Sequence, residues 1–305
     1  MASASIPFQH VELKSVLVAT DLSESCDNAL EHGIAIARHY GATLFLVHVV
    51  SSLGFTLAGP DAVELAAEVS QRDIDSLVHQ LVASGRLNGV ETRPIILTGN
   101  VDEEIDSFVR AHHVDLIVVG SHGRQGIARL FFGSIAQLIT KCCCCPVLTV
   151  GPQASGPWLG NPADSGKPLL FATALNKVSE KALPYAVALA NDFERQLFAL
   201  HIVSPHRTYL HHMDRLAHEV NEASVKAYLN SLMPPGTILR QAITFLAESC
   251  DPAEGILRAA KRIDAVTIVM GAHSESFSDL AIRHSGSIFN RVNREARCPV
   301  LTVRG

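Results

Sequence analysis

The residues best suited to chemistry in this chain form a glycine-rich stretch that ends in a serine. Gly120, Gly123, Gly133 and Ser134 follow the apolar run 116–119, which is typical of a buried parallel strand. Glycines let a backbone approach a ligand closely, and the free N–H groups at the start of a helix favour anions. The stretch predicts a loop that binds a phosphate chain; the alternative is a loop that only turns the chain.

The spacing of this stretch differs from that of two common phosphate-binding motifs. It has neither the Gly-Lys-Ser/Thr of a Walker A loop nor the Gly-x-Gly-x-x-Gly of the dinucleotide fingerprint. Residues 1–155 hold 9 Lys and Arg against 16 Asp and Glu, a net charge of -7. A phosphate site in this acidic half must therefore rely on backbone N–H groups, on Arg124 and Arg129, and on a divalent cation.

The elements around the stretch alternate between short apolar strands and amphipathic helices. Ser23 is the predicted cap of the first helix. Alternation of this kind predicts a parallel, doubly wound sheet, in which the carboxyl ends of the strands line the ligand crevice. In the first half we predict strands at 14–19, 43–50, 90–97, 116–119 and 146–150, and helices at 23–40, 61–84, 102–112 and from 134.

The same unit occurs twice in the chain, and all the matches share one offset of 153 residues. A period of this length indicates duplicated domains. We therefore predict an N-terminal domain at 1–150, a linker rich in Pro, Gly and Ser at 151–168, and a C-terminal domain at 169–305. The matched segments are Leu17–Thr20 with Leu170–Thr173, His48 with His201, Gly133–Ile135 with Gly286–Ile288, and Cys145–Val150 with Cys298–Val303.

The pattern Gly120-x2-Gly123-x9-Gly133-Ser134, followed by Cys145-Pro-Val-Leu-Thr-Val150, resembles the ATP-binding signature of the universal stress protein family. The resemblance covers the chain apart from the N-terminal arm and the linker, so the whole is similar to a tandem universal stress protein. It implies an α/β fold of two tandem Rossmann-like domains of the adenine nucleotide alpha-hydrolase type, each with a five-stranded parallel sheet. It also implies ATP with Mg2+ as the ligand and a role in the stress response.

The resemblance also implies which residues line the nucleotide pocket. The family has an Asp beside the adenine at the end of the first strand, and Asp21 matches it; the alternative role of Asp21 is a helix N-cap beside Ser23. Val49 matches the position whose backbone reads the adenine edge. The matching residues are Ala19, Thr20, Asp21, Val49, Val119, Gly120, His122, Gly123, Arg124, Gly133, Ser134 and Ile135.

The second half departs from this pattern at the positions that matter for ATP. Ala174 replaces Asp21, and Ser274 replaces Gly123. Glu275 and Asp279 would repel a phosphate chain nearby. We therefore expect the C-terminal domain to keep the fold without a standard ATP site.

Two other clusters invite a metal interpretation. Cys142–Cys145 contains Cys-x2-Cys, but small buried thiols are the preferred interpretation. His206, His211, His212 and His218 can bind zinc or form a partly solvated helix face, and we assign no metal site. We also assign no catalytic residue: no nucleophile elbow Gly-x-Ser-x-Gly occurs, and the recurrence of His48 as His201 favours a structural role.

Length and composition set the broad class of the protein. The 305 residues, 48% of them hydrophobic and 18% charged, predict two well-packed domains. The net charge of -5 argues against a general nucleic-acid binder. The N-terminal residues have no signal-peptide pattern, and no apolar run is long enough to span a membrane, so we expect no membrane partner and a cytoplasmic location.

Together these patterns predict a regulatory protein that binds an adenine nucleotide and whose occupancy is read conformationally by an unknown protein partner. The alternatives are a slow ATPase or nucleotidyl-transferring enzyme, with His122 as candidate base, and a carrier of a lipid or sugar-nucleotide in the C-terminal crevice. Single-domain members of the resembled family usually dimerise through their terminal strands. We therefore expect an intrachain pseudo-dimer through the strands 146–150 and 299–303, with a homodimer also open.

Overall fold

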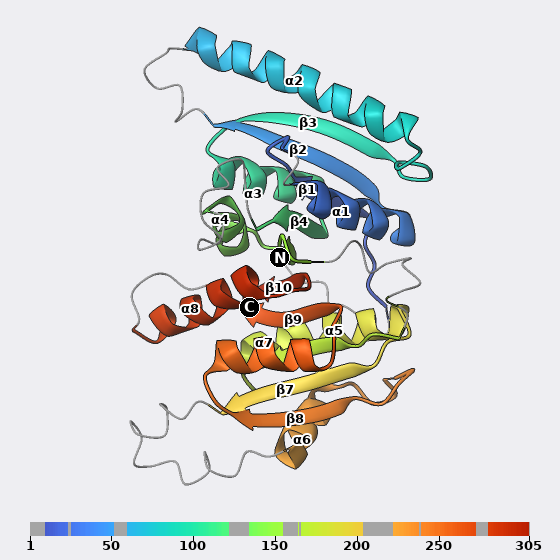
Figure 1. Ribbon diagram of the computed structural model, residues 1–305, viewed down its shortest axis with the longest axis vertical. Helices are drawn as coiled ribbons and strands as arrows, with labels where there is room; N and C mark the ends of the chain where they lie inside the picture. The colour runs from blue at the N-terminus through green and yellow to red at the C-terminus, as the bar shows by residue number, and fades with distance from the viewer. Residues whose placement is uncertain are drawn as a thin grey trace. The chain divides into compact units, whose positions relative to one another are not determined.

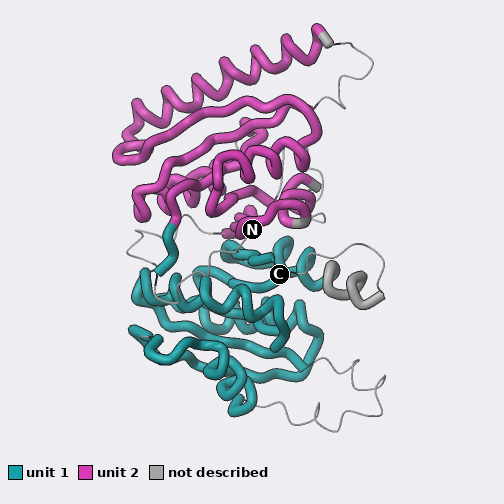
Figure 2. Tube along the Cα trace, turned by 180° about the vertical axis from the view of Figure 1, so that it is seen from behind, with its two compact units in different colours: residues 1–12, 162–305 teal, residues 13–161 magenta. Residues whose placement is uncertain are grey.

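The computed structural model describes residues 10–23, 26–51, 60–121, 134–154, 164, 166–203, 222–237, 239–272 and 280–304. The chain divides into two compact units (Figure 2). One unit is Leu13–Asn161, and the other is Pro162–Gly305 together with the N-terminal arm. Each unit alternates strands and helices, as Figure 1 shows, and the predicted duplication of an α/β domain is confirmed.

The first unit has a five-stranded parallel sheet in the order β3-β2-β1-β4-β5. Strand β1 is flanked by β2 and β4, so the direction of winding reverses at the boundary between β1 and β4. The elements are β1 (Ser15–Ala19), α1 (Asp27–Tyr40), β2 (Thr43–Ser51), α2 (Pro60–Ala83), β3 (Thr92–Gly99), α3 (Val101–His112), β4 (Leu116–Gly120), α4 (Ser134–Cys142) and β5 (Val147–Val150).

The second unit repeats this sheet in the order β10-β9-β6-β7-β8, again with parallel pairs throughout. Its reversal of winding lies between β6 and β9. The elements are β6 (Leu169–Thr173), α5 (Lys177–Asp192), β7 (Leu197–Val203), α6 (Glu222–Leu232), β8 (Thr244–Ser249), α7 (Pro252–Arg262), β9 (Thr267–Ala272), α8 (Leu280–Glu295) and β10 (Val300–Arg304).

The core of each unit forms because the central strands are buried on both faces. Val16, Leu17 and Val18 of β1 are fully buried, as their continuous apolar run predicts. Helix α1 lies very close to this strand, because Gly33 has no side chain: a Cβ there would lie 2.2 Å from Cγ2 of Val18. Helix α1 is thereby held over the carboxyl half of β1.

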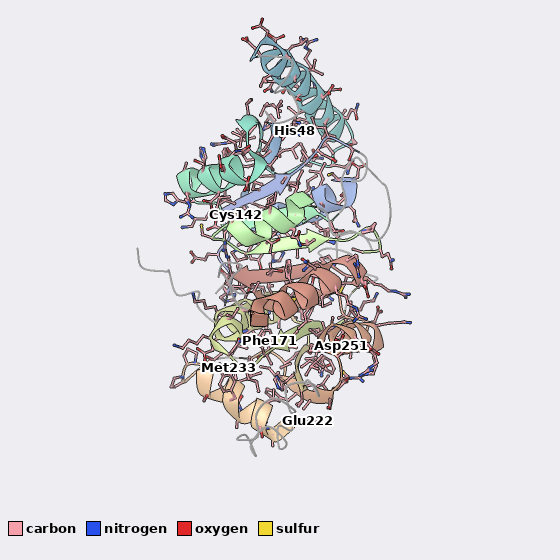
Figure 3. All side chains as sticks on the ribbon, turned by 90° about the vertical axis from the view of Figure 1, so that its left-hand side faces the viewer. His48, Cys142, Phe171, Glu222, Met233 and Asp251 are labelled. Carbon is pink, nitrogen blue, oxygen red and sulfur yellow. The ribbon has the colours of Figure 1, made fainter. Side chains whose placement is uncertain are left out.

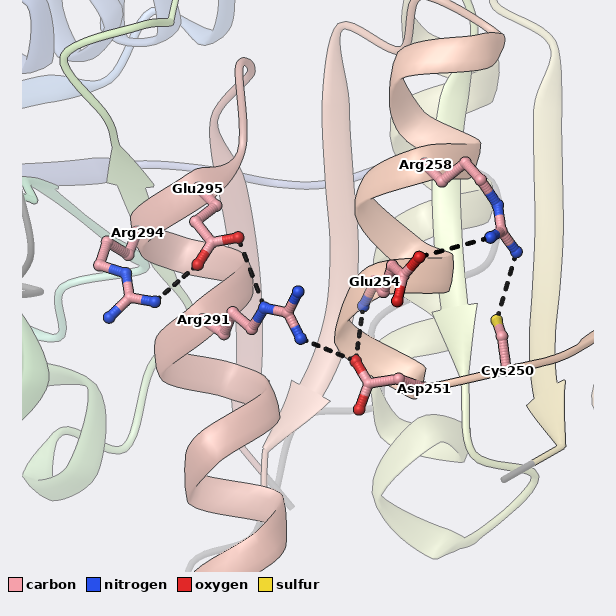
Figure 4. Close-up of polar contacts among 7 residues, drawn as sticks. All are labelled: Cys250, Asp251, Glu254, Arg258, Arg291, Arg294 and Glu295. Carbon is pink, nitrogen blue, oxygen red and sulfur yellow. Dashed lines mark hydrogen bonds and ion pairs between the residues drawn. The ribbon is translucent and has the colours of Figure 1, made fainter. Parts of the chain in front are cut away.

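Ion pairs tie the helices of the second unit together (Figure 4). Asp251 caps α7 by accepting a hydrogen bond from the backbone N–H of Glu254 at 2.9 Å. The same carboxylate oxygen accepts a hydrogen bond from Arg291 of α8, also at 2.9 Å. In the first unit the cap of α3 is Asn100, which makes no side-chain capping hydrogen bond. The duplicated fold is therefore held by different polar contacts in its two copies.

The boundary between the units differs from the predicted domains at the N-terminal arm. Val11 is buried, and its N–H donates to a carboxylate oxygen of Asp192 at 3.2 Å. Nδ1 of His10 lies 2.7 Å from the other oxygen of Asp192. Asp192 ends α5, so the arm packs with the C-terminal unit rather than with the domain 1–150 to which it was assigned. A stretch too short to form an element gave no sequence signal for this contact.

The predicted linker 151–168 is anchored at both of its ends. Asn28 of the first unit donates to the carbonyl of Ala154 at 2.8 Å. The buried side chain of Arg195 in the second unit donates to the carbonyl of Lys167 at 2.9 Å and to that of Asp164. The division between units falls at 161–162, inside the predicted linker.

Candidate functional site

The candidate site lies where the carboxyl ends of β1, β2 and β4 meet. The strand register pairs Ala19 of β1 with Val47 of β2 and with Val119 of β4. The segments that leave β1 and β4 therefore begin side by side at the reversal of winding, whereas β2 continues beyond Val47 to Ser51. In parallel α/β sheets this is the place where ligands bind.

A tight turn after β1 holds the first of these segments. The N–H of Thr20 donates to the carbonyl of Val47 at 2.9 Å, and its hydroxyl accepts from the N–H of Leu22 at 3.0 Å. Leu22 has a φ of +60°, a conformation that costs a residue with a side chain about 1–3 kcal/mol. Nδ1 of His48 donates to the carbonyl of Thr20 at 2.8 Å, which fixes the tautomer of this half-buried ring (Figure 3). The backbone at Thr20 is thus fixed from three sides.

Asp21 follows in this turn, and its carboxylate organises the residues before α1. Oδ1 accepts hydrogen bonds from the N–H of Ser23 at 3.0 Å, from the hydroxyl of Ser23 at 2.5 Å and from Sγ of Cys26 at 3.0 Å. Burial raises the pKa of Cys26 to about 11, so its thiol keeps the proton that it donates. Asp21 itself stays half-exposed at the edge of the sheet.

The predicted cap of α1 is wrong. The helix begins at Asp27 with Cys26 as its N-cap, and no side chain accepts a capping hydrogen bond there. The N–H and the hydroxyl of Ser23 both donate to Asp21, and its carbonyl accepts from the N–H of Cys26 at 3.0 Å, so Ser23 closes a turn before the helix. Asp21 likewise binds within the turn and does not act as the N-cap, although it does stabilise the approach to the helix.

The other described pocket residues offer backbone more than side chains. Val119 is buried at 4% exposure and Thr20 at 9%, so their side chains belong to the core. Val49 and Gly120 are half-buried, and Ala19, which ends β1, is half-buried as well. Val49, Gly120 and Ala19 offer a ligand mainly backbone groups, whereas the N–H and the carbonyl of Thr20 are already bonded to Val47 and His48.

The phosphate side of the candidate site begins at Gly120. Ser121, which sequence reasoning did not single out, is fully buried, and its N–H donates to the carbonyl of Val150 at 2.9 Å. Ser134 begins α4, as predicted, and Ile135 in the first turn is exposed. The remaining predicted residues, His122, Gly123, Arg124 and Gly133, lie outside the described residues.

The start of α4 also differs electrostatically from the start of α3. The first turn of α3 holds Asp102, Glu103 and Glu104, which complement the positive end of the helix dipole. The first turn of α4 holds no acidic residue. A first turn without acidic side chains suits an anion better than the first turn of α3 does.

The second unit reproduces the turn but not the site. The hydroxyl of Thr173 accepts from the N–H of Leu175 at 3.1 Å, Leu175 has a φ of +52°, and Nδ1 of His201 donates to the carbonyl of Thr173 at 2.9 Å. Ala174 stands where the first unit has Asp21 and offers no side-chain acceptor. The repeat of the histidine contact in this unit supports the structural role predicted for His48 and His201.

The helix after this turn closes over the reversal of winding in the second unit. Asn176 caps α5 by accepting from the N–H of Ser179 at 3.0 Å, and α5 begins at Lys177. A Cβ on Gly271, at the end of β9, would lie 2.7 Å from the carbonyl oxygen of Val178. The first turn of α5 therefore occupies the space beside the end of β9.

The two candidate metal clusters have different outcomes. Residues 206–218, with the predicted histidines, lie outside the described residues. Within the described part of the chain, no group of three or more His, Cys, Asp or Glu side chains is arranged to hold a metal ion. Cys143 and Cys145 are buried thiols as predicted, but Cys144 is exposed and Cys142 is half-buried, so that prediction is wrong for two of the four.

Among the described helices, none is long and apolar enough to cross a membrane.

The fold is a tandem duplication of a doubly wound α/β domain, and the candidate site lies at the reversal of winding of its first copy. The chain belongs to the universal stress protein family, whose sequence pattern matches residues 12–151 and 166–304.

Individual relatives and a solved structure agree with this assignment. The universal stress protein MJ0531 of Methanocaldococcus jannaschii is 30% identical over 138 residues, which cover 45% of this chain and 81% of the relative. The universal stress protein YxiE of Bacillus subtilis is 29% identical over 144 residues, covering 44% of this chain and 97% of the relative. A universal stress protein from Archaeoglobus fulgidus has the same fold over 98% of both chains, with a TM-score of 0.70 and 18% identity.

Proposed function

We propose that the first unit binds ATP with Mg2+ at the carboxyl edge of β1, β2 and β4. The observation that supports this best is the position of Asp21 next to the start of the glycine-rich stretch. The register of Ala19 with Val119 puts the Asp21 turn and Gly120 on neighbouring strands. A base-binding carboxylate and a phosphate-binding loop would then start at the same point of the sheet.

In this proposal each pocket residue has a defined task. Asp21 accepts a hydrogen bond from the adenine amine or a ribose hydroxyl, and the backbone of Val49 reads the adenine edge. The phosphates meet the loop that starts at Gly120 and the N–H groups at Ser134, where the first turn of α4 carries no acidic residue. Mg2+ offsets the negative charge of a half that has a net charge of -7. The loop residues His122, Gly123, Arg124 and Gly133 complete the proposed pocket.

We propose that the second unit does not bind ATP at the corresponding position. Its turn lacks the carboxylate, because Ala174 replaces Asp21. The packing of Val178 against Gly271 also fills space at its reversal of winding. A carrier role for this unit, for a lipid or sugar-nucleotide, remains the alternative, and mass spectrometry of ligand released from the purified protein tests it.

The mechanism that we propose is conformational. Nucleotide occupancy biases the conformation of the loop 121–132, and a protein partner in the stress response recognises that conformation in the cytoplasm. No residue is assigned a catalytic role. A slow ATPase, the main alternative, would show turnover that the substitution His122→Ala reduces.

The test is a calorimetric titration of the full chain with ATP, with and without Mg2+. Gly123→Val should weaken binding about tenfold or more, because a branched side chain in the phosphate loop clashes or strains the backbone. The matched substitution Ser274→Val, at the equivalent position of the second unit, should leave the affinity unchanged. Normal ATP binding by the Gly123→Val variant would overturn the proposed site.

A further inference from the structure

Two neighbouring thiols lie at the end of α4, outside the proposed nucleotide pocket. Sγ of Cys142 and Sγ of Cys143 are 3.8 Å apart. Cys143 is completely buried, whereas Cys142, labelled in Figure 3, is half-buried. The pair thus joins one accessible sulfur to one protected sulfur within thiol hydrogen-bond distance.

The two thiols differ in acidity in a way that suits a reaction between them. The hydrogen bond from Cys143 lowers the pKa of Cys142, against burial and the carboxylates of Asp106 and Asp102, which raise it. The same hydrogen bond, together with burial, raises the pKa of Cys143. Cys142 is the nucleophile of the pair because it is the half-buried thiol, which peroxide can reach, whereas Cys143 is completely buried.

The second unit shows that the fold does not need these thiols. Of the four consecutive cysteines, the offset of 153 residues repeats only Cys145, as Cys298; Glu295, Ala296 and Arg297 take the other three positions. The N–H of Cys143 donates to the carbonyl of Ile139 at 3.0 Å, and the N–H of Ala296 makes the equivalent bond to Val292 at 2.9 Å. The same helix end thus forms with alanine in place of Cys143.

We propose that Cys142 and Cys143 are a dithiol that peroxide oxidises reversibly to a disulfide. The thiolate of Cys142 attacks one oxygen of hydrogen peroxide, the O–O bond breaks, and hydroxide leaves and becomes water. The resulting sulfenic acid is then attacked by the sulfur of Cys143, which loses its proton; the S–S bond forms as the S–O bond breaks and a second water leaves. Two thiols lose two electrons and two protons, and one peroxide becomes two waters.

The geometry makes such a disulfide a reversible one. Neighbouring Cα atoms are ~3.8 Å apart across a trans peptide, below the usual range of ~4.4–6.8 Å for a disulfide. Bonds outside that range are strained and easily reduced, as in regulatory disulfides. The sulfurs must close from 3.8 Å to ~2.05 Å, and the backbone between them must rotate. The hydrogen bond from Cys143 to Ile139 lies on this backbone, so oxidation should loosen the last turn of α4.

The experiment treats the reduced full-length protein with hydrogen peroxide, blocks free thiols with N-ethylmaleimide and analyses the peptide that contains residues 142–145 by mass spectrometry. The expected product lacks two hydrogen atoms, takes up two fewer maleimides and returns to the reduced form with dithiothreitol. Cys143→Ala copies the second unit and should stop at a sulfenic acid on Cys142 that dimedone labels. Cys144→Ser, at the exposed neighbour, should leave disulfide formation unchanged.

Three results would overturn this proposal. One is a disulfide in that peptide of the Cys143→Ala variant, which would make Cys144 or Cys145 the partner. Another is a disulfide between chains that disappears with Cys144→Ser. The third is no oxidation of Cys142 at peroxide concentrations that oxidise glutathione in the same solution. Because none of these measurements involves nucleotide, they stand apart from the test of ATP binding.

Discussion

At the scale of single residues, Asp21 combines a structural task with the proposed ligand contact. The carboxylate already accepts hydrogen bonds from Ser23 and Cys26. Asp21→Ala should therefore reduce the stability of the first unit and also weaken ATP binding. Loss of an acceptor costs about 1–3 kcal/mol, which corresponds to a roughly ten- to hundred-fold weaker Kd. Calorimetric titration and urea unfolding of the same variant measure the two effects.

Two further variants separate these effects. Asp21→Asn keeps one oxygen for the Ser23 turn and loses the second, so it should preserve stability but weaken ATP binding. Asn176→Ala removes the cap of α5 in the second unit, which should cost about 1 kcal/mol of stability without changing the affinity for ATP. If Asp21→Ala lowers the stability but leaves the affinity for ATP unchanged, then Asp21 acts only in the turn before α1.

At the scale of elements, the contact between α1 and β1 depends on Gly33. Alanine is favoured over glycine inside a helix by about 0.5–1 kcal/mol. That gain is smaller than the cost of forcing a Cβ to 2.2 Å from Val18, a stiff β-branched side chain in a fully buried strand, which is about 1–3 kcal/mol. Gly33→Ala should therefore lower the unfolding midpoint of the first unit in urea.

A matched control for Gly33 exists in α7. A Cβ on Gly255 would lie 2.6 Å from Sγ of Cys250 and from Cδ1 of Ile202, which are the ends of side chains that can rotate. Gly255→Ala should accordingly destabilise its unit less than Gly33→Ala destabilises the first. An equal or larger loss for Gly255→Ala would show that close approach at Gly33 does not govern the packing of α1.

Helix α7 provides a prediction about pH. Glu248 accepts hydrogen bonds from Arg258 at 2.9 Å and from Arg262 at 2.8 Å. The bond from Arg258 is the main reason that the pKa of Glu248 lies below its ordinary value of 4.5, with burial opposing it and Arg262 adding to it. A lowered pKa in the folded state stabilises the protein above pH 4.5, and this stabilisation is lost as the pH falls through the folded value.

Glu248→Gln should therefore destabilise the second unit at neutral pH by about 1 kcal/mol, since both arginines are half-exposed. The difference from the wild type should shrink in urea unfolding as the pH falls below 4.5 and through the lowered folded-state pKa, because the carboxylate then becomes protonated in both states. Glu254→Gln is the control, because its pair with Arg258 is longer, at 3.7 Å, and more exposed. A difference in unfolding free energy that persists in acid would show that the effect of Glu248→Gln comes from packing and not from charge.

The elements show which features the sequence could predict. Continuous apolar runs predicted β1, β4 and β5. A strand that is buried on both faces has apolar side chains at every position, so its sequence is an uninterrupted apolar run. The start of α1 was missed because a serine before a helix resembles a cap, and only the structure shows that its N–H and its hydroxyl both donate to Asp21. The burial of the four cysteines could not be predicted either, since it depends on the direction of each side chain at the end of α4.

At the scale of the whole molecule, the duplication separates what the fold requires from what one copy has added. Both units keep the threonine turn, the leucine at positive φ and the histidine that holds the turn. Asp21 and the Cys142–Cys143 pair occur only in the first. The pairing of the two terminal strands, which the duplication also suggests, stays a prediction.

The last prediction is that the full chain binds one ATP. Only the first half has both the carboxylate at the turn and the second glycine of the loop. In the second half, restoring the carboxylate should not restore a site, because Val178 still packs against Gly271 and Ser274 still replaces the glycine. Calorimetry should thus give one ATP per chain for the wild type and for Ala174→Asp, and lose this site in Gly123→Val. Two equal sites in the wild type would show that the packing of Val178 against Gly271 leaves room for nucleotide.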